Sequence, residues 1–330
     1  MEEMISVVVV TYNQEQTIAR TLESILCQRC HLPIEIVIGE DASTDGTRAI
    51  CEDYAKRYPQ IRLFSNQQNK GVADNYIDCL LACKGKYIAD CAGDDFWVDP
   101  EKLEKEVSVM EQHPQVSMVI TNWRFFNERT QQTEPGHQKA LAPITPGHQL
   151  LEAFITQTGM SVFHLCSSLY RADIFRSCYQ ADPAFFRSSV TEDLQIACAM
   201  AQHGDIAYLP DVTLHYSIGN ESISAQKDEA RQFRFLRHVT LLSFDLAKRF
   251  QLNSPTIEAF LSQRVFVLGM HAFRAHDTAL FQETLDCEKE WQSKRTTKTC
   301  VLFSVMRHEA LWRIALILRH VFVKLKQARR

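Results

Sequence analysis

The feature that most constrains the fold is a continuous apolar run, Val7 to Val10, close to the start of the chain. Such a run of β-branched residues is typical of a strand that is buried on both faces, as in a parallel sheet covered by helices. Polar residues follow it directly, so a loop is expected there. Strand and helix patterns alternate four times up to residue 95, which predicts an α/β fold with a right-handed, mainly parallel sheet flanked by helices.

The second half of the chain has a different pattern. Two short strands are predicted at Ala207 to Leu209 and Val212 to Tyr216, and from Asp228 onward the pattern is almost entirely helical. We therefore expect an α/β domain over residues 1–224 and a helical C-terminal extension over residues 225–330. A chain of 330 residues with 45% hydrophobic content can bury the core of either one large domain or two smaller ones.

Charge and cysteine content exclude several classes of protein. Lysine and arginine number 36 against 40 acidic residues, so no overall attraction to nucleic acid is expected and no nucleic-acid partner is predicted. Acidic residues precede the first apolar run, unlike a signal peptide, and no apolar run reaches the roughly 20 residues of a membrane span. Eleven cysteines, an odd number, favour reduced thiols. These features predict a cytoplasmic protein.

Polar side chains follow three of the predicted strands, where a sheet of this kind binds its ligands. Any one of them alone is more typical of an ordinary turn, but their coincidence at three strand ends favours a site. The candidates are Thr11, Tyr12 and Asn13 after the first strand, Asp41 after the second, and Asp94 and Asp95 after the fourth.

Adjacent carboxylates such as Asp94 and Asp95 suit a hard divalent cation, Mn²⁺ or Mg²⁺, which prefers oxygen ligands and often shares them with substrate phosphates. The sequence contains neither a GxGxxG motif after the first strand nor a GxxxxGK[ST] motif. A metal ion is therefore the expected means of holding a phosphate group.

Five segments carry a specific resemblance: VVVVTYN, IEIVIGEDASTDGT, NKGVADNY, GKYIADCAGDDFWVDPEKLEKEV and TEDLQIA. In this order they resemble the motifs of the family 2 inverting glycosyltransferases, of the bacterial surface-glycan type, which have the GT-A fold. The resemblance extends from about Ile5 to Ser222. It implies metal-dependent transfer of a sugar from a nucleotide-sugar donor, expected to be a UDP-sugar, to a hydroxyl of a glycan or lipid-linked acceptor.

The resemblance also implies roles for the candidates at the strand ends. Thr11, Tyr12 and Asn13 match the loop beside the nucleotide. Asp41 matches the carboxylate that hydrogen-bonds the base. In the DxD-type motif, Asp94 corresponds to the carboxylate near the ribose and phosphates, and Asp95 to the metal ligand.

The resemblance assigns the general base to Asp193. An inverting transfer needs one base to take the acceptor proton, while a metal stabilises the departing diphosphate. From the pattern alone, the acids after Thr191 equally fit the start of a helix.

The sequence departs from the family pattern at two places. Tyr216-Ser217-Ile218-Gly219 stands where related sequences often have Tyr-Arg-x-His, so the expected histidine is missing. His215 lies on the opposite side of a strand alternation from Tyr216. Glu40 replaces the first acid of the usual Asp-Asp pair.

Two further motifs are interpreted as structural. Cys27-Gln28-Arg29-Cys30-His31 spells CxxCH, but an α/β context disfavours haem attachment and no second pair supplies four zinc ligands. Isolated histidines are interpreted as surface or core residues: His113, His137, His148 and His164.

The C-terminal segment from Arg307 to Arg330 has seven basic residues and one Glu among apolar residues. Two interpretations stay open. The helix packs against the protein or a partner, or it binds an anionic membrane surface as an interfacial helix, which would place the protein peripherally on the inner face of the cytoplasmic membrane.

Two other functions share part of this pattern. A nucleotidyltransferase acting on sugar phosphates has a similar sheet and metal carboxylates, but attacks phosphorus and does not need Asp193 as a base. A non-catalytic nucleotide-binding assembly protein would bind the nucleotide without turnover.

Overall fold

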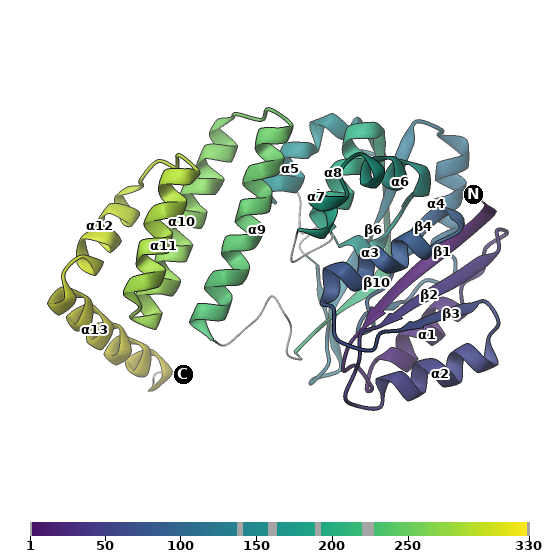
Figure 1. The fold of residues 1–330 in the computed structure, drawn as a ribbon, viewed down its shortest axis with the longest axis horizontal. Helices are drawn as coiled ribbons and strands as arrows, with labels where there is room; N and C mark the ends of the chain where they lie inside the picture. Colours follow the sequence, from purple (N-terminus) through teal and green to yellow (C-terminus); the bar gives the residue numbers. More distant parts are fainter. Residues whose placement is uncertain (1, 137–140, 158–163, 189–192, 220–227, 329–330) are drawn as a thin grey trace. The chain divides into compact units, whose positions relative to one another are not determined.

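The computed structural model describes residues 2–136, 141–157, 164–188, 193–219 and 228–328. It divides into two compact units, Met1–Asn220 and Glu221–Arg330 (Figure 1). The boundary expected at residues 224 and 225 falls within 220–227, outside the described residues.

The first half of unit 1 is a parallel sheet in the order β3-β2-β1-β4. Its strands are β1 (Glu2–Thr11), β2 (Ile34–Glu40), β3 (Ile61–Ser65) and β4 (Gly85–Asp90). The helices that connect them are α1 (Ile18–Leu26), α2 (Thr47–Arg57) and α3 (Val72–Ala82). The alternating strands and helices predicted from the sequence are therefore present, as four strands and three connecting helices, and the α/β fold is confirmed.

The second half of the sheet is mixed. Strand β9 (Ser168–Arg171) is antiparallel to both β4 and β6 (Val116–Asn127), and β6 runs parallel to β10 (Asp205–Ile218). Three short antiparallel strands complete it: β5 (Phe96–Trp97), β7 (Gln132–Pro135) and β8 (Ile144–Thr145). The helices of this half are α4 (Lys102–Gln112), α5 (Leu151–Thr156), α6 (Ala172–Ala181), α7 (Pro183–Arg187) and α8 (Asp193–His203), with short 3₁₀ turns η1 (Gly147–Gln149) and η2 (Leu165–Ser167).

The prediction of two short strands near residue 210 was wrong, because both belong to the single strand β10. Its register against β6 shifts between Leu209 and Val212, on either side of Pro210. Proline cannot donate a ladder hydrogen bond and is tolerated at such a bulge. The break in the pattern therefore marks an irregularity within one strand.

The core of unit 1 explains the valine run. Val7 and Val9 pair in register with Ile36 and Ile38, and all four are fully buried. On helix α1, the buried residues Ile18, Leu22 and Ile25 recur at the spacing of one helical face and belong to the same core cluster. Each such side chain contributes about 1.5–3 kcal/mol by leaving water, so this layer fixes the strand ends that carry the candidate site.

All the regular secondary structure in the described residues of unit 2 is helical, as predicted. It contains α9 (Glu229–Arg249), α10 (Pro255–Ala275), α11 (Thr278–Glu290), α12 (Thr297–Met306) and α13 (Glu309–Ala328). Four of these helices begin with a side chain that accepts a hydrogen bond from the first turn: Asp228, Ser254, Asp277 and Thr296. No helix within the described ranges is long and apolar enough to span a membrane.

Helix α4 carries an ion pair whose two side chains are both fully buried. Lys102 Nζ lies 2.7 Å from Glu106 Oε2 and 4.5 Å from the centre of the Trp97 ring in β5. Burial raises the pKa of Glu106 to about 7, against the opposing effect of the Lys102 charge. The pair thus links α4 to the strand that directly follows Asp95.

We predict that Lys102→Met destabilises the protein by about 3–5 kcal/mol, because removing one partner leaves a buried carboxyl group without its counter-charge. Urea denaturation at neutral pH measures the change in unfolding free energy. Lys105→Met is the matched control, since Lys105 pairs with Asp99 and Asp211 at the surface and should contribute about 1 kcal/mol or less. Equal losses in both variants would contradict a special role for the buried pair.

Candidate active site

The carboxylate of Asp41 organises the loop that follows β3. Its Oδ1 accepts hydrogen bonds from Asn66 Nδ2 and the Lys70 amide, and its Oδ2 accepts one from the Gly71 amide, each at 2.9 Å. The Asp41 amide in turn donates to Thr11 O at 3.0 Å. Asp41 therefore joins the ends of β1 and β2 to the loop at residues 66–71.

The turn after β1 is held to the turn after β2. Asn13 has a left-handed backbone with φ 54°, which asparagine tolerates better than most residues. Its Oδ1 accepts a hydrogen bond from the Thr44 amide at 2.8 Å, and its own amide donates to Ser43 Oγ at 3.0 Å. Thr11 is buried, whereas Tyr12 is 45% exposed. The exposed ring of Tyr12 is therefore open to contact with a ligand.

Glu40, which replaces the first acid of the family pair, has a structural environment. It is fully buried; its Oε2 accepts a 2.6 Å bond from Arg48 Nε, and its Oε1 accepts a 2.6 Å bond from the Ser43 amide. This paired carboxylate holds the same turn as Asn13.

The turn that carries Asp94 and Asp95 approaches the end of β1 closely because of Gly93. A Cβ atom at Gly93 would lie 2.8 Å from Thr11 Oγ1 and would also clash with the Gln14 side chain. The Gly93 amide donates to Val10 O at 3.1 Å. Glycine is thus required for the Asp94-Asp95 turn to approach Thr11 and Gln14.

Helix α1 and strand β10 hold the carbonyl groups of this turn. Thr17 Oγ1 donates to Gly93 O at 2.9 Å, and Thr21 Oγ1 donates to Asp95 O at 2.6 Å. Ser217, at the end of β10, donates from Oγ to Asp94 O at 2.6 Å. These bonds fix the backbone beneath both carboxylates.

Arg20 also reaches this turn, which the sequence did not indicate. Its Nη2 donates to Asp94 O at 3.1 Å and to Ser217 Oγ at 3.3 Å, and its guanidinium forms an ion pair with Glu128. The guanidinium lies 4.1 Å from the centre of the Phe96 ring. A helix α1 residue thus places a cation beside Ser217, where the family pattern often has arginine.

Asp95 is the more deeply buried acid, with 1% of its surface exposed. Its Oδ1 accepts a 2.8 Å bond from the Ser217 amide, whereas its Oδ2 is buried with no nitrogen or oxygen hydrogen-bond partner among the described residues. The weak thiol donor of Cys166 adjoins the carboxyl group. Burial, followed by the charge of Asp94, raises the pKa of Asp95 well above its usual range.

Asp94 is partly buried, and its pKa is also raised, by burial and by the charge of Glu128. Two adjacent acids with raised pKa values, one with an unsatisfied oxygen, fit a divalent cation. Its charge would replace the missing hydrogen bond and favour the ionised carboxylates. Asp95 and Asp94 would supply the protein oxygens.

Asp193 is the first residue of helix α8, and burial raises its pKa to about 6. Its charge contributes to the raised pKa values of Asp95 and Asp90, so these carboxyl groups share one electrostatic environment. Thr191 and Glu192 lie outside the described residues. A carboxyl group with a pKa near neutrality suits proton acceptance at physiological pH.

Two histidines flank the end of β10 on opposite sides. The His164 ring stacks on Tyr216 with centroids 4.1 Å apart, and burial lowers its pKa to about 4. The His215 ring instead packs edge-on against Phe96 at 5.1 Å. Burial, followed by the charges of Asp95 and Asp94, raises the pKa of Tyr216, so Tyr216 and the His164 ring stacked on it lie on the carboxylate side.

Sequence reasoning missed Asp90, the last residue of β4. Both of its carboxyl oxygens are buried and have no hydrogen bond of standard geometry among the described residues. The hydroxyls of Tyr76 and Tyr170, which lie 3.0 Å from each other, are next to this carboxyl group. Burial is the main cause of its pKa near 7. An acid at the end of a buried strand was the available signal, but the nearby Asp94-Asp95 pair obscured it.

Solved structures resemble this fold. The structure of S. aureus TarS 1–349 in complex with UDP-GlcNAc has a TM-score of 0.56 at 15% identity, covering 89% of this chain and 93% of that chain. The mannosyltransferase PcManGT from Pyrobaculum calidifontis, in complex with GDP-Man and Mn²⁺, has a TM-score of 0.54 at 16% identity, covering 98% of this chain and 88% of that one. These similarities support the GT-A-like fold predicted from the sequence.

Relatives are similar over part of the chain. An uncharacterized protein of Mycobacterium tuberculosis is 44% identical over 124 residues, 37% of this chain and 36% of the relative. The putative glycosyltransferase EpsE of Bacillus subtilis is 40% identical over 38% of this chain and 44% of its own length. The Escherichia coli protein WfgD is named a UDP-Glc:α-D-GlcNAc-diphosphoundecaprenol β-1,3-glucosyltransferase. It is 28% identical over 38% of this chain and 48% of its own length. The match spans less than half of each relative.

The family comparison covers more of the sequence. Residues 6–178, more than half of the chain, match the family described as Glycosyl transferase family 2. This range contains both the turn after β1 and the Asp94-Asp95 turn, and it confirms the resemblance seen in the sequence motifs. The chain therefore belongs to glycosyl transferase family 2.

Proposed function

We propose that the chain is an inverting glycosyltransferase that moves a sugar from a nucleotide diphosphate to an acceptor hydroxyl. The observation that carries the proposal is the group of carboxyl groups Asp94, Asp95 and Asp193: all three have raised pKa values, and the charges of Asp94 and Asp193 both act on the buried Asp95. One carboxyl oxygen of the buried Asp95 also has no hydrogen-bond partner among the described residues, a cost to stability that is typical of a functional site.

In this proposal, Asp95 and Asp94 hold Mn²⁺ or Mg²⁺. The bound ion would supply Lewis-acid stabilisation of the departing diphosphate. Binding of Mn²⁺ in the PcManGT structure supports this choice of ion. The loop organised by Asp41, together with Thr11, Tyr12 and Asn13, would bind the nucleoside at the ends of β1 and β2.

Asp193 acts as the general base. It accepts the proton of the acceptor hydroxyl while that oxygen attacks the anomeric carbon and the bond from carbon to the diphosphate oxygen breaks. One displacement inverts the anomeric configuration, and no enzyme nucleophile takes part. Burial makes Asp193 suitable for this step. With a pKa of about 6, its carboxyl group is mostly ionised at neutral pH and is a stronger proton acceptor than an ordinary aspartate.

The donor we propose is a UDP-sugar, and the acceptor a growing surface polysaccharide, lipopolysaccharide or lipid-linked glycan. The UDP-GlcNAc complex of TarS supports the nucleotide, and the name of WfgD supports a lipid-linked acceptor. Incubation with UDP-sugars and metal distinguishes this function from its rivals. UDP release supports transfer, pyrophosphate release would indicate nucleotidyl transfer, and binding without turnover would indicate an assembly protein.

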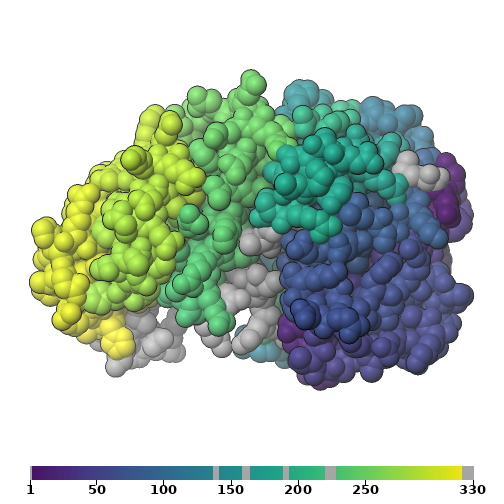
Figure 2. Space-filling model, viewed as in Figure 1, coloured from purple at the N-terminus to yellow at the C-terminus, as the bar shows by residue number. Residues whose placement is uncertain are grey.

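We further propose that the C-terminal helix binds an anionic membrane surface, placing a cytoplasmic enzyme peripherally at its inner face. Trp312 is fully buried and donates from Nε1 to Phe273 O of α10 at 2.9 Å. Other apolar residues of α13 are exposed, with 49–64% of their surface accessible: Leu311, Ile314, Ile317, Leu318 and Val321. Figure 2 shows the last helices of unit 2 in yellow. Basic residues alternate with these apolar residues, as in interfacial helices.

Asp95→Ala is expected to lower kcat/KM by at least about a hundredfold, because metal stabilisation of the leaving group contributes several kcal/mol. Metal-dependent UDP binding, measured by calorimetry, should be lost together with activity, while circular dichroism stays unchanged. Asp53→Ala, at an exposed site on α2, is the control. Retained metal-dependent UDP binding in Asp95→Ala would remove Asp95 from the metal site.

Asp193→Asn is expected to lower kcat about 10²–10⁴-fold with near-normal donor affinity, because the amide cannot accept the proton. In the parent enzyme, kcat/KM should rise with pH through about 6, as Asp193 loses its proton, and this limb should disappear in the variant. NMR coupling constants should show an inverted product. Retention of configuration, or undiminished transfer by the variant, would refute the mechanism.

Ile317→Glu with Leu318→Glu should reduce sedimentation with phosphatidylglycerol vesicles, because charges replace the exposed apolar face. High salt should also weaken binding by the parent chain, since charge attraction is screened beyond a Debye length of about 8 Å at physiological ionic strength. Leu81→Glu, an exposed apolar site on α3, is the matched control. Equal vesicle binding by all forms would favour a packing role for α13.

A further inference from the structure

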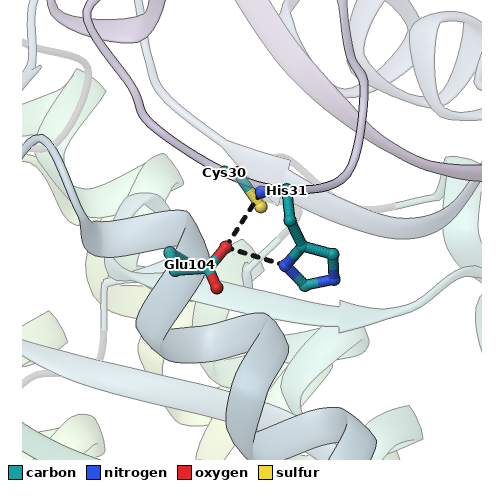
Figure 3. A group of neighbouring side chains, drawn as sticks. All are labelled: Cys30, His31 and Glu104. Carbon is teal, nitrogen blue, oxygen red and sulfur yellow. Dashed lines mark hydrogen bonds and ion pairs between the residues drawn. The ribbon is translucent and has the colours of Figure 1, made fainter.

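The segment between α1 and β2 presents a group of nitrogen, sulfur and oxygen ligands that the transfer reaction does not use. Cys30 Sγ, a ring nitrogen of His31 and a carboxylate oxygen of Glu104 all lie within 4.8 Å of one another (Figure 3). Cys30 and His31 come from this segment, whereas Glu104 comes from helix α4. The three therefore converge from two separate elements.

The two elements are held together without the help of this group. The Arg29 amide donates to Pro100 O at 2.8 Å, and the Gln28 side chain bridges Asp99 O and the Leu103 amide, at 2.8 and 3.2 Å. The positions of the three side chains are thus set by the contact of the segment with the start of α4. A site whose ligands are held in advance loses less conformational entropy when an ion binds.

Glu104 is oriented toward the other two side chains. Its Oε2 accepts a 3.0 Å bond from the His31 amide and lies 2.8 Å from His31 Nδ1 (Figure 3). The hydrogen bond from the His31 amide is the main cause of a lowered pKa of Glu104, so this acid is ionised at neutral pH. A charged oxygen is thereby directed at the imidazole and the thiol.

A second carboxylate lies on the far side of the imidazole. Glu111 is seven residues beyond Glu104 on α4, two turns along the same face, and its Oε1 lies 3.6 Å from His31 Nε2. Among the described residues, His31 is the one cationic side chain recorded within ion-pair distance of either acid. The group therefore carries more negative than positive charge.

We propose that Cys30, His31 and Glu104 bind a zinc ion, at a site separate from the Asp94-Asp95 turn. Thiolate, imidazole and carboxylate are all zinc ligands, and three protein ligands with a solvent molecule complete a tetrahedron. Mn²⁺ and Mg²⁺, which prefer oxygen ligands, should bind here weakly. The ion would fasten the segment between α1 and β2 to helix α4.

Binding releases a proton to solvent, because the thiolate is the ligand and the Cys30 thiol is protonated in the free protein. Burial is the main cause that raises the pKa of Cys30, to about 11. His31 would bind through Nδ1 with its proton on Nε2, facing Glu111. A carboxylate on the second ring nitrogen orients histidine ligands in zinc sites.

Cobalt(II) titration monitored by absorption tests the proposal, since cobalt replaces zinc and reports sulfur ligation directly. At one equivalent, in excess Mg²⁺, the protein should develop a thiolate-to-cobalt charge-transfer band and the visible bands of tetrahedral cobalt. Zinc should then abolish both by displacement. Cys30→Ser should lose the charge-transfer band, and His31→Gln and Glu104→Gln should each weaken zinc binding more than about tenfold in a chelator competition, as even outer partners contribute 10–100-fold.

Three matched variants complete the design. Cys27→Ser changes the other cysteine of the CxxCH motif, Cys300→Ser changes an exposed cysteine of unit 2, and Asp95→Ala removes the ligand proposed for the catalytic metal. All three should keep the parent cobalt spectrum. Absence of a charge-transfer band in the folded parent protein, its persistence in Cys30→Ser, or its loss in Cys27→Ser would overturn the proposed site.

Discussion

The close approach of the Gly93 turn to the end of β1 is the constraint on which the rest of the candidate site depends. Only a residue without a side chain fits beside Thr11 and Gln14 at this point. The turn is then tied to the first βα unit by Thr17 and Thr21, and to the last strand of the sheet by Ser217. Residues separated by more than 120 positions in sequence thus define one small volume, and the burial of the surrounding acids follows from this tight backbone arrangement.

The acids near this volume divide into two groups by their partners. Glu40, Glu106 and Glu128 each have a bonded cation, supplied by Arg48, Lys102 and Arg20. Burial raises the pKa values of Asp90, Asp95 and Asp193, as it does that of Glu106, but these three acids have no ion pair with a cation among the described residues. An acid that only supports the fold is stabilised by a fixed counter-charge, whereas an acid that meets a ligand must leave that position open. This contrast distinguishes the proposed site from the structural ion pairs around it.

The sequence predicted the parallel half of the sheet well, because each strand there is a short apolar run followed by polar residues. Asp41, Asp94 and Asp95 were selected as candidates in this way, since ligands bind at the carboxyl ends of parallel strands. Strand β9 runs in the opposite direction, so the residues that precede it lie at the same edge of the sheet. His164 and Cys166 reach the site by this route, and the interpretation of His164 as isolated could not foresee its stacking on Tyr216. Arg20 was missed because helix periodicity does not reveal which distant backbone groups a long side chain meets.

The distribution of the free cysteines offers an intrinsic means of studying the two units. Six are buried with thiol pKa values raised chiefly by burial, namely Cys51, Cys79, Cys83, Cys91, Cys198 and Cys287. Because the thiolate is the reactive form, such thiols react slowly with alkylating reagents. The exposed cysteines are Cys27 in unit 1 and Cys300 in unit 2. A maleimide fluorophore or spin label therefore has one preferred attachment point in each unit, and the natural chain carries its own pair of probes for measuring the distance between them.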